Sequence, residues 1–217
     1  MILSQLIPAY EVIKKIGKGS YGKVYKVKRK SDNEIFAMKT LEIISMNQKD
    51  LTNTLNEIWF LCSIECNYIC GYEESFVINN GELLCIVMEF VGGGDVLSKI
   101  RTCKEQNLEI NEETIWKYIC QILIGLKKLH KFKIIHRDIK SANLFLSEDF
   151  EEVKLGDLGI AKLAKWGFGE TQVGTPYYLA PEIWQNNHYD YKCDIFSFGC
   201  VVYEMAALRV PFQGVSL

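Results

Sequence analysis

The chain has 217 residues, 48% of them hydrophobic, and a formal net charge of -2, which is enough apolar material for one or two globular lobes. A charge balance this close to neutral gives no support for a general attraction to nucleic acid or to membrane surfaces. No apolar run approaches the roughly eighteen residues that a membrane-spanning helix needs, and Pro8 cuts short an apolar opening that lacks a basic region, so no signal peptide is expected.

The cysteines allow two interpretations. Cys62, Cys66 and Cys70 recur at a regular spacing that could suggest metal ligands, but no histidine lies near them and the spacing matches no zinc pattern. The others, such as Cys85 and Cys200, sit in apolar runs, where a free cysteine behaves as a small hydrophobic residue. We therefore expect reduced thiols in a cytoplasmic protein.

The first elements predicted are three strands with a glycine-rich turn between the first two. The turn contains Gly17, Gly19 and Gly22, and a third strand is predicted over 35–39. A dinucleotide-binding fold would enter a helix after the third glycine, whereas residues 24–27 alternate with a period of two. The pattern thus favours a hairpin lid whose backbone amides can approach phosphate.

A helix is predicted next, over 48–64, from its apolar spacing. It carries Glu57, and the preceding strand carries Lys39. A lysine in a half-buried strand needs a counter-charge, and Glu57 could supply it while aiming the ammonium group at a nucleotide. The alternative is that Glu57 belongs to a solvated helix face.

The middle of the chain predicts a hairpin, a linker and two helices. Strands over 76–78 and 83–88 flank a turn, and the glycine-rich stretch 89–94 is the predicted linker between lobes. Asp95 is expected to cap a short helix over 96–101, and Asn111 a long core helix with acidic residues in its first turn.

The densest group of polar side chains follows, between short apolar runs that we interpret as buried strands. Asp138, Lys140 and Asn143 lie in a loop after 134–135, and Asp157 follows the strand-like run 153–155. Carboxylate and amide oxygens are the ligands that Mg²⁺ takes, and a second acid can orient a hydroxyl and accept its proton. The alternative is a pair of acidic loops on a soluble domain.

The last third contains a polar segment and an apolar helix. Residues 160–175 are too long for an ordinary connection, so we expect them to be functional or mobile. A helix is predicted over 192–208, with apolar residues around most of its circumference, which is typical of a helix inside a core.

These motifs carry a family resemblance. The run His-Arg-Asp-Ile-Lys-Ser-Ala-Asn at 136–143 resembles the catalytic loop of protein kinases, and Asp-Leu-Gly at 157–159 resembles their metal-binding Asp-Phe-Gly. Taken with the glycine hairpin, the chain resembles eukaryotic serine/threonine protein kinases over 10–217. Within them, 136–146, 154–161 and 173–179 are most similar to the NIMA-related kinases.

The resemblance implies an α+β, bilobal fold with a small antiparallel sheet lobe and a mainly helical large lobe. It divides the chain into an extension (1–9), an N-lobe (10–88), a hinge (89–94) and a C-lobe (95–217). Family members continue with further helices and an arginine that pairs with the residue corresponding to Glu182, so the C-lobe is expected to be incomplete. Two packing positions depart from the family pattern, Leu158 and Phe196.

The same resemblance implies catalytic roles. Lys39, held by Glu57, would contact the α- and β-phosphates of ATP. Asp138 would orient the substrate hydroxyl and accept its proton, while Lys140 would steady the transferring group and favour serine or threonine over tyrosine. Mg²⁺ would be held by Asn143 and Asp157.

It also implies a nucleotide pocket and a regulatory site. The glycines of the lid would cover the phosphates, and the adenine would contact Ile16, Val24, Ala37, Met88 as gatekeeper, Glu89, Val91 and Leu146. A phosphate on Thr171, four residues before Thr175 in the mobile segment, could pair with Arg137 and order that segment. An ordinary loop threonine is the alternative.

The resemblance implies ATP and protein substrates as partners, with microtubule, centrosome or cilium association by analogy alone. By the same analogy, we expect a cytoplasmic protein that could associate with the cytoskeleton or the cilium. Two rival functions stay open: a pseudokinase scaffold, which would be expected to have lost a catalytic group, and a kinase of lipids or small molecules. Asp95 and Glu204 could attract basic residues flanking a target, or serve as a cap and a structural pair.

Overall fold

The computed structural model describes residues 7–19, 22–44, 46–47, 51–52, 58, 62–156, 177–185 and 189–212. They form two compact units. The first contains the described residues up to Glu65 together with Cys70–Phe90, and the second contains Cys66–Ile69 and the described residues from Val91 onward. The chain passes from one unit to the other between Phe90 and Val91, and also on either side of Cys66–Ile69, a short segment inside the range 10–88 that was predicted as one lobe.

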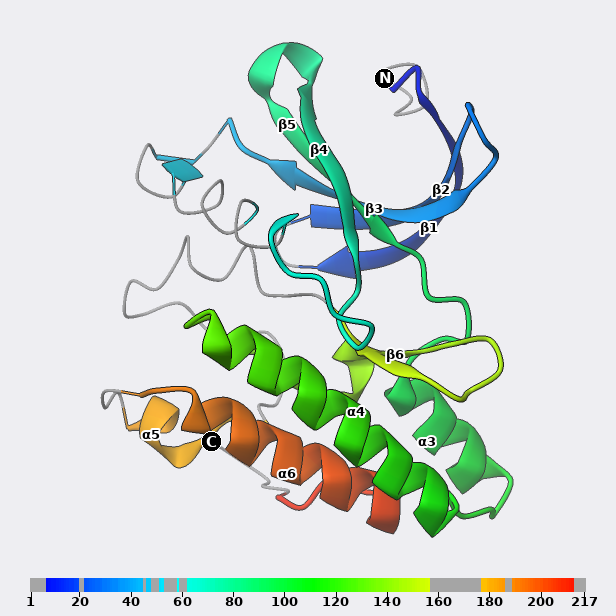
Figure 1. Ribbon diagram of the computed structural model, residues 1–217, viewed down its shortest axis with the longest axis vertical. Helices are drawn as coiled ribbons and strands as arrows, with labels where there is room; N and C mark the ends of the chain where they lie inside the picture. Colours follow the sequence, from blue (N-terminus) through cyan, green and yellow to red (C-terminus); the bar gives the residue numbers. More distant parts are fainter. Residues whose placement is uncertain are drawn as a thin grey trace. The chain divides into compact units, whose positions relative to one another are not determined.

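The first unit is built on a five-stranded antiparallel sheet (Figure 1). Its strand order is β1-β2-β3-β5-β4, and a short 3₁₀ turn, η1 (Asn79–Gly81), connects β4 to β5. The glycine-rich segment is a β1/β2 hairpin, with Gly19 opposite Gly22, and no helix follows it. The predicted sheet lobe is thus confirmed, and its strands are β1 (Tyr10–Gly19), β2 (Gly22–Arg29), β3 (Ile35–Glu42), β4 (Tyr72–Ile78) and β5 (Leu83–Glu89).

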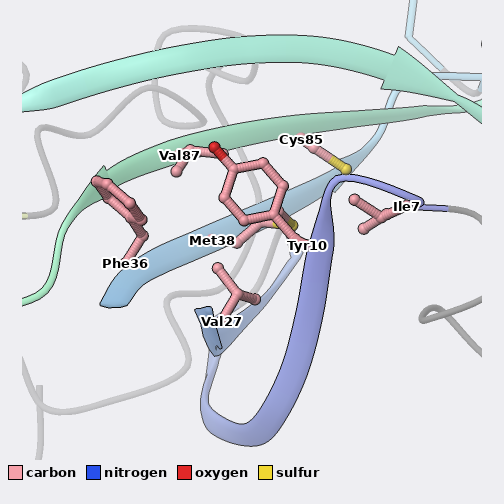
Figure 2. Close-up of a cluster of buried hydrophobic side chains, with 7 residues drawn as sticks. All are labelled: Ile7, Tyr10, Val27, Phe36, Met38, Cys85 and Val87. Carbon is pink, nitrogen blue, oxygen red and sulfur yellow. The ribbon is translucent and has the colours of Figure 1, made fainter. Parts of the chain in front are cut away.

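One face of this sheet forms a compact apolar cluster (Figure 2). Tyr10 lies at its centre, fully buried, with its ring edge-on to Phe36 at 6.3 Å and stacked on Phe76 at 6.2 Å. Each large apolar side chain buried here contributes roughly 1.5–3 kcal/mol. Besides Tyr10 and Phe36, the buried members are Ile7, Val27, Met38, Cys85 and Val87.

The predicted helix over 48–64 lies mostly outside the described residues. Of its members, Leu51, Thr52, Ile58 and Cys62 have helical backbone. Ile58 is buried and packs with Leu41, Leu84 and Ile86, on the face of the sheet opposite the Tyr10 cluster. Glu57, the predicted partner of Lys39, lies outside the described residues.

The second unit is mainly helical, with α4 and α6 running side by side (Figure 1). Asp95 caps α3 through its carboxylate, which accepts from the amide of Ser98 at 2.7 Å, and Asn111 caps α4, accepting from Glu113 at 2.8 Å. Both caps were predicted. The elements are α3 (Val96–Glu105), α4 (Glu112–Lys131), η2 (Ser141–Asn143), β6 (Leu144–Leu146), β7 (Val153–Leu155), α5 (Pro181–Trp184) and α6 (Lys192–Ala207).

Two sequence-based expectations differ from the structure. Residues 134–135 are not a strand: the amide of Ile134 bonds to the carbonyl of Leu129 at 3.1 Å, so this segment closes the end of α4. Helix α3 runs to Glu105, beyond the predicted end at 101. The prediction stopped early because the last turn is mostly polar and exposed and therefore gave no apolar signal. Isolated apolar pairs fit a strand or a helix end equally well.

Helix α6 has one buried face and one exposed face. Phe198, Val201 and Met205 are buried, as are the polar Asp194 and Glu204. Ile195 and Tyr203, in contrast, are 44% and 41% exposed. The buried face of α6 agrees with the predicted core helix, while another part of its apolar circumference is exposed. Among the described residues, no helix has the length and apolar character that a membrane span requires.

Candidate active site

The polar group of the predicted catalytic loop converges on Asp138. The Lys140 ammonium lies 2.9 Å from Asp138 Oδ2, and the side-chain amide of Asn143 donates to the same oxygen at 2.9 Å. Asn143 Nδ2 also donates to the backbone carbonyl of Asp138 at 2.8 Å. A single carboxylate oxygen therefore receives one cationic and one neutral donor, and both fix the orientation of the carboxyl group.

The side-chain amide of Asn143 carries an NH₂ donor and an oxygen acceptor, and the structure shows what the NH₂ group binds. Its amide nitrogen has two hydrogens, and both are directed at Asp138. The side chain is 6% exposed, so it is held in one orientation. Its amide oxygen, a hard ligand, is thus the atom left for a cation such as Mg²⁺.

The backbone of this loop is held by a carboxylate from α6. Asp194, 1% exposed, accepts from the amide of His136 at 2.9 Å and from the amide of Arg137 at 2.8 Å. His130 Nε2 at the end of α4 lies 2.8 Å from the same carboxylate. These contacts stabilise Arg137 at φ 65, a conformation that costs a non-glycine residue roughly 1–2 kcal/mol.

The ring of His136 joins the loop to the strand before Asp157. Its Nδ1 accepts from the amide of Asp138 at 3.3 Å, so Nε2 carries the proton and donates to the carbonyl of Gly156 at 3.1 Å. The buried, neutral ring of His136 therefore connects the backbone of Gly156, the residue directly before Asp157, to the backbone of Asp138. Asp157 itself lies outside the described residues.

Arg137 occupies a distinctive environment within the described part of the chain. Its guanidinium carbon is 5.6 Å from the centre of the Tyr189 ring, and its Nε is buried without a hydrogen-bond partner there. A buried cationic donor with no acceptor is rare in native structures and calls for an explanation. The other two predicted regulatory residues, Thr171 and Thr175, lie outside the described residues.

The first unit gathers several predicted nucleotide residues on one sheet face. In the register of the sheet, Val24 is opposite Lys39, and Ala37 is opposite Met88. Ala37 and Lys39 are two residues apart along β3 and therefore point to the same face of the sheet, and residues paired across neighbouring strands also share a face. All four side chains therefore lie on one face. Ile16, on the edge strand, is 42% exposed. Lys39 is half-buried on β3, which was the premise for expecting a counter-charge beside it.

The glycines of the hairpin are not equivalent. A Cβ at Gly22 would lie 1.9 Å from the carbonyl oxygen of Thr40, so only glycine fits between β2 and β3. A Cβ at Gly17 would meet Val24 at an ordinary 3.5 Å. The requirement for glycine at Gly22 is therefore one of strand packing, independent of any phosphate.

The predicted linker contains one further close approach. Gly93 donates to the carbonyl of Leu146 at 2.8 Å, Leu146 donates to the carbonyl of Gly94 at 2.8 Å, and a Cβ at Gly93 would lie 2.1 Å from the carbonyl oxygen of Ser147. Leu146, a predicted adenine contact, is fully buried beside them. The amide of Glu89, a predicted hinge contact, bonds to the carbonyl of Gly71 at 2.8 Å, so this amide is already engaged within the sheet unit. Val91, the other predicted hinge contact, is half-buried.

Two acids left with two possible roles by the sequence are resolved, and two anchoring side chains were missed. Asp95 is a helix cap and Glu204 is a buried structural partner of Tyr178, which is the second of the two alternatives for each. The anchoring roles of Asp194 and His130 were not predicted. An acid near the start of a mainly apolar helix was the available signal at Asp194, because such a group is buried only when it has partners.

The described residues contain no group of three or more His, Cys, Asp or Glu side chains that could hold a metal ion. All eight cysteines are described, and each is a free thiol. Burial raises the pKa of the Cys85 thiol to about 12, so this residue is an inert part of the core. No metal-centred function follows from the cysteines.

A sheet unit with a glycine-rich hairpin and a helical unit with a loop centred on Asp138 are the parts of a protein kinase domain. The family model described as "Protein kinase domain" matches residues 10–216, and the chain belongs to the protein kinase family. Within that family, its relatives are serine/threonine kinases of the Nek type, as the motifs predicted.

Three of these relatives illustrate the extent of the match. The chain is 37% identical to the probable serine/threonine-protein kinase nek2 of Dictyostelium discoideum, over 95% of this chain and 50% of that protein. It is 40% identical to Nek3 of Mus musculus, over 95% of this chain and 39% of the relative, and 40% identical to Nek5 of Homo sapiens, over 96% and 29%. The chain thus spans half or less of the length of these relatives.

Proposed function

We propose that the protein transfers the γ-phosphoryl group of ATP to serine or threonine hydroxyls of protein substrates. The observation that carries the proposal is the group formed by Asp138, Lys140 and Asn143, in which an ammonium and an amide both bind one carboxylate oxygen. Membership of the protein kinase family and similarity to Nek-type kinases support it. A scaffold that has lost its chemistry has no support from a loop with all three side chains present and hydrogen-bonded.

Each of these residues has a separate task in the proposed reaction. Asp138 accepts a hydrogen bond from the substrate hydroxyl and takes up its proton as the oxygen attacks phosphorus. Lys140, held at 2.9 Å from Asp138, is a cation that can also stabilise charge on the transferring group. Lys39, from β3, binds the phosphates of ATP, and the hairpin backbone covers them.

Mg²⁺ is the metal implied by the family, and the described ligand fits it. The amide oxygen of Asn143 is a hard donor that its own hydrogen bonds leave available. Asp157, outside the described residues, is the proposed second ligand. When bound, the ion neutralises phosphate charge and orients the transferred group.

The proposal is tested by removing the proton acceptor alone. Asp138→Asn keeps the size of the side chain, so we expect nucleotide binding to persist while phosphorylation of a generic serine/threonine substrate falls. Lys39→Met should reduce turnover by misplacing ATP. Asp149→Asn is the matched control, because Asp149 is exposed and lies on the loop between β6 and β7. Wild-type rates for Asp138→Asn would refute the role assigned to this residue.

We further propose that a phosphate on Thr171 regulates this activity by binding Arg137. The buried Nε of Arg137, without a hydrogen-bond partner in the described residues, supports an anionic partner, and a phosphate brings nearly two negative charges. Mass spectrometry of ATP-incubated protein should find phosphate on Thr171, and Thr171→Ala should lower activity. Thr102→Ala, on the exposed side of α3, is the control. Unchanged activity in Thr171→Ala would remove this proposal.

Protein partners at microtubules, centrosomes or cilia, and a cytoplasmic location, are proposals that rest on the Nek-type resemblance. Eight free cysteines support a reducing compartment. Microscopy of the tagged protein, with a tubulin counterstain, tests both; a secreted or disulfide-linked protein would contradict them.

A further inference from the structure

A chain of two hydroxyl groups and one carboxylate connects the catalytic loop to α6. The hydroxyl of Tyr178 lies 3.1 Å from Ser141 Oγ and donates to Glu204 Oε2 at 2.7 Å. Ser141 is fully buried and Glu204 is 4% exposed. Polar groups taken out of water at this depth are tolerated when they are paired, and the half-buried Tyr178 pairs with both of them.

The direction of the hydrogen bonds follows from the number of protons. A tyrosine hydroxyl has one hydrogen, and that of Tyr178 is directed at the Glu204 carboxylate. The serine hydroxyl is therefore the donor to Tyr178, giving the order Ser141 to Tyr178 to Glu204. Burial, chiefly, raises the pKa of Tyr178 well above its ordinary value of 10.0, so its proton stays in place at neutral pH.

Tyr178 is attached to α6 at both ends of the residue. Its side chain bonds to Glu204, and its backbone carbonyl accepts from the hydroxyl of Ser197 at 2.7 Å. Tyr178 is thus a fixed point on α6, and it stands directly after the segment that carries Thr175. Through Ser141, this fixed point is connected to the catalytic loop.

The attachment point on the loop is close to the proposed chemistry. Ser141 begins η2, immediately after Lys140 and two residues before Asn143. The amide of Asn143 closes this turn by bonding to the carbonyl of Lys140 at 2.9 Å. A displacement of Ser141 would therefore move both side chains that bind the carboxylate of Asp138.

We propose that Ser141 and Tyr178 are positioning residues, which set the catalytic loop against α6 and make the placement of Lys140 and Asn143 depend on the position of Tyr178. The inference rests on the proposed kinase function for its effect on rate. Neither side chain touches the reacting atoms. The position of Tyr178 would then influence turnover through one serine hydroxyl.

Ser141→Ala is the sharpest test, because it removes the loop's bond and leaves Tyr178 paired with Glu204. We expect kcat to fall about five- to tenfold, the kinetic equivalent of one misplaced neutral hydrogen bond, while the KM for ATP and the Tm change little. Tyr178→Phe should lower kcat at least as far and also lower the Tm, because it leaves Glu204 without its donor. The double variant should be no slower than Tyr178→Phe, since both changes break the same chain.

Tyr177→Phe is the matched control, since Tyr177 is the adjacent, half-buried tyrosine of the same segment. Hydrogen–deuterium exchange of the peptide covering 138–146 gives a readout that does not need activity: it should speed up in Ser141→Ala and Tyr178→Phe and stay unchanged in the control. If the wild type transfers phosphate and Ser141→Ala keeps kcat within about twofold with unchanged exchange, the inference is overturned. If the wild type transfers none, the proposed function fails, and the exchange result alone then supports or overturns the positioning role.

Discussion

Replacing Asp194 with asparagine should destabilise the protein far more than its single-atom difference suggests. The carboxylate is 1% exposed and accepts from the amides of His136 and Arg137 and from the ring of His130. An asparagine side chain offers one acceptor oxygen, and its NH₂ group would face a backbone donor. At least one buried N–H is then left without an acceptor.

The magnitude follows from what is lost. A hydrogen bond to a charged group contributes roughly 1.5–3 kcal/mol, and a buried donor left unsatisfied costs roughly 1–3 kcal/mol. Asp194→Asn should therefore lower the free energy of unfolding by about 3–5 kcal/mol, a large part of the ~5–15 kcal/mol of a typical domain. For a chain of this size each kcal/mol lowers the Tm by about 2–4 °C, so a fall of roughly 6–20 °C is expected. The backbone amide of Arg137 would also lose the hydrogen bond that stabilises this residue at its positive φ.

Urea denaturation and thermal unfolding of the two proteins measure this effect. Asp190→Asn is the control: Asp190 is exposed, precedes the same helix and accepts one amide hydrogen, from Lys192 at 2.8 Å. Asparagine accepts such a bond as well, so the control should change stability by less than ~0.5 kcal/mol. A loss of less than 1 kcal/mol in Asp194→Asn would show that the carboxylate does not hold the catalytic loop as argued.

Two further predictions concern other parts of the chain. Gly22→Ala should lower the free energy of unfolding by about 1–3 kcal/mol, because the new Cβ would lie 1.9 Å from the Thr40 carbonyl, whereas Gly17→Ala meets only ordinary contacts; equal thermal unfolding of the two variants would contradict this. The pKa of Asp149 is held below its ordinary 3.8, chiefly by the hydroxyl of Ser147, so this carboxylate contributes stability at neutral pH that is lost as pH falls through its folded-state pKa. Ser147→Ala should raise that pKa in a carboxyl-resolved NMR titration, and an unchanged value would refute the assignment.

Local features of the fold were predictable because they are encoded in neighbouring residues. The alternation after Gly22 gave the hairpin, and Asp95 and Asn111 gave two helix starts, each through a side chain that bonds to its own first turn. The short apolar pair at 134–135 was misread, since its hydrogen bonds go back to α4 rather than to a neighbouring strand.

Contacts between distant segments were not predictable from spacing. Asp194 anchors His136 across 58 residues, and Tyr178 bonds to Ser141 across 37. No periodicity or turn signal reports which buried acid will meet which amide, because that depends on how α4, α6 and the loop pack. The role of Glu204 stayed open between two alternatives for the same reason, because the partner that decides it is a tyrosine 26 residues away. The roles predicted for Glu57 and Asp157 stay predictions, as both lie outside the described residues.

The central claim, that this chain is a serine/threonine kinase, is tested most directly by identifying the residue that receives phosphate. The protein, with ATP and Mg²⁺, is incubated with a peptide mixture in which serine, threonine and tyrosine acceptors are otherwise matched, and the products are located by mass spectrometry. The proposed function predicts phosphate on serine or threonine, none on tyrosine, and loss of the signal in Asp138→Asn. Phosphate on tyrosine, or no transfer by a folded wild-type protein, would contradict the claim.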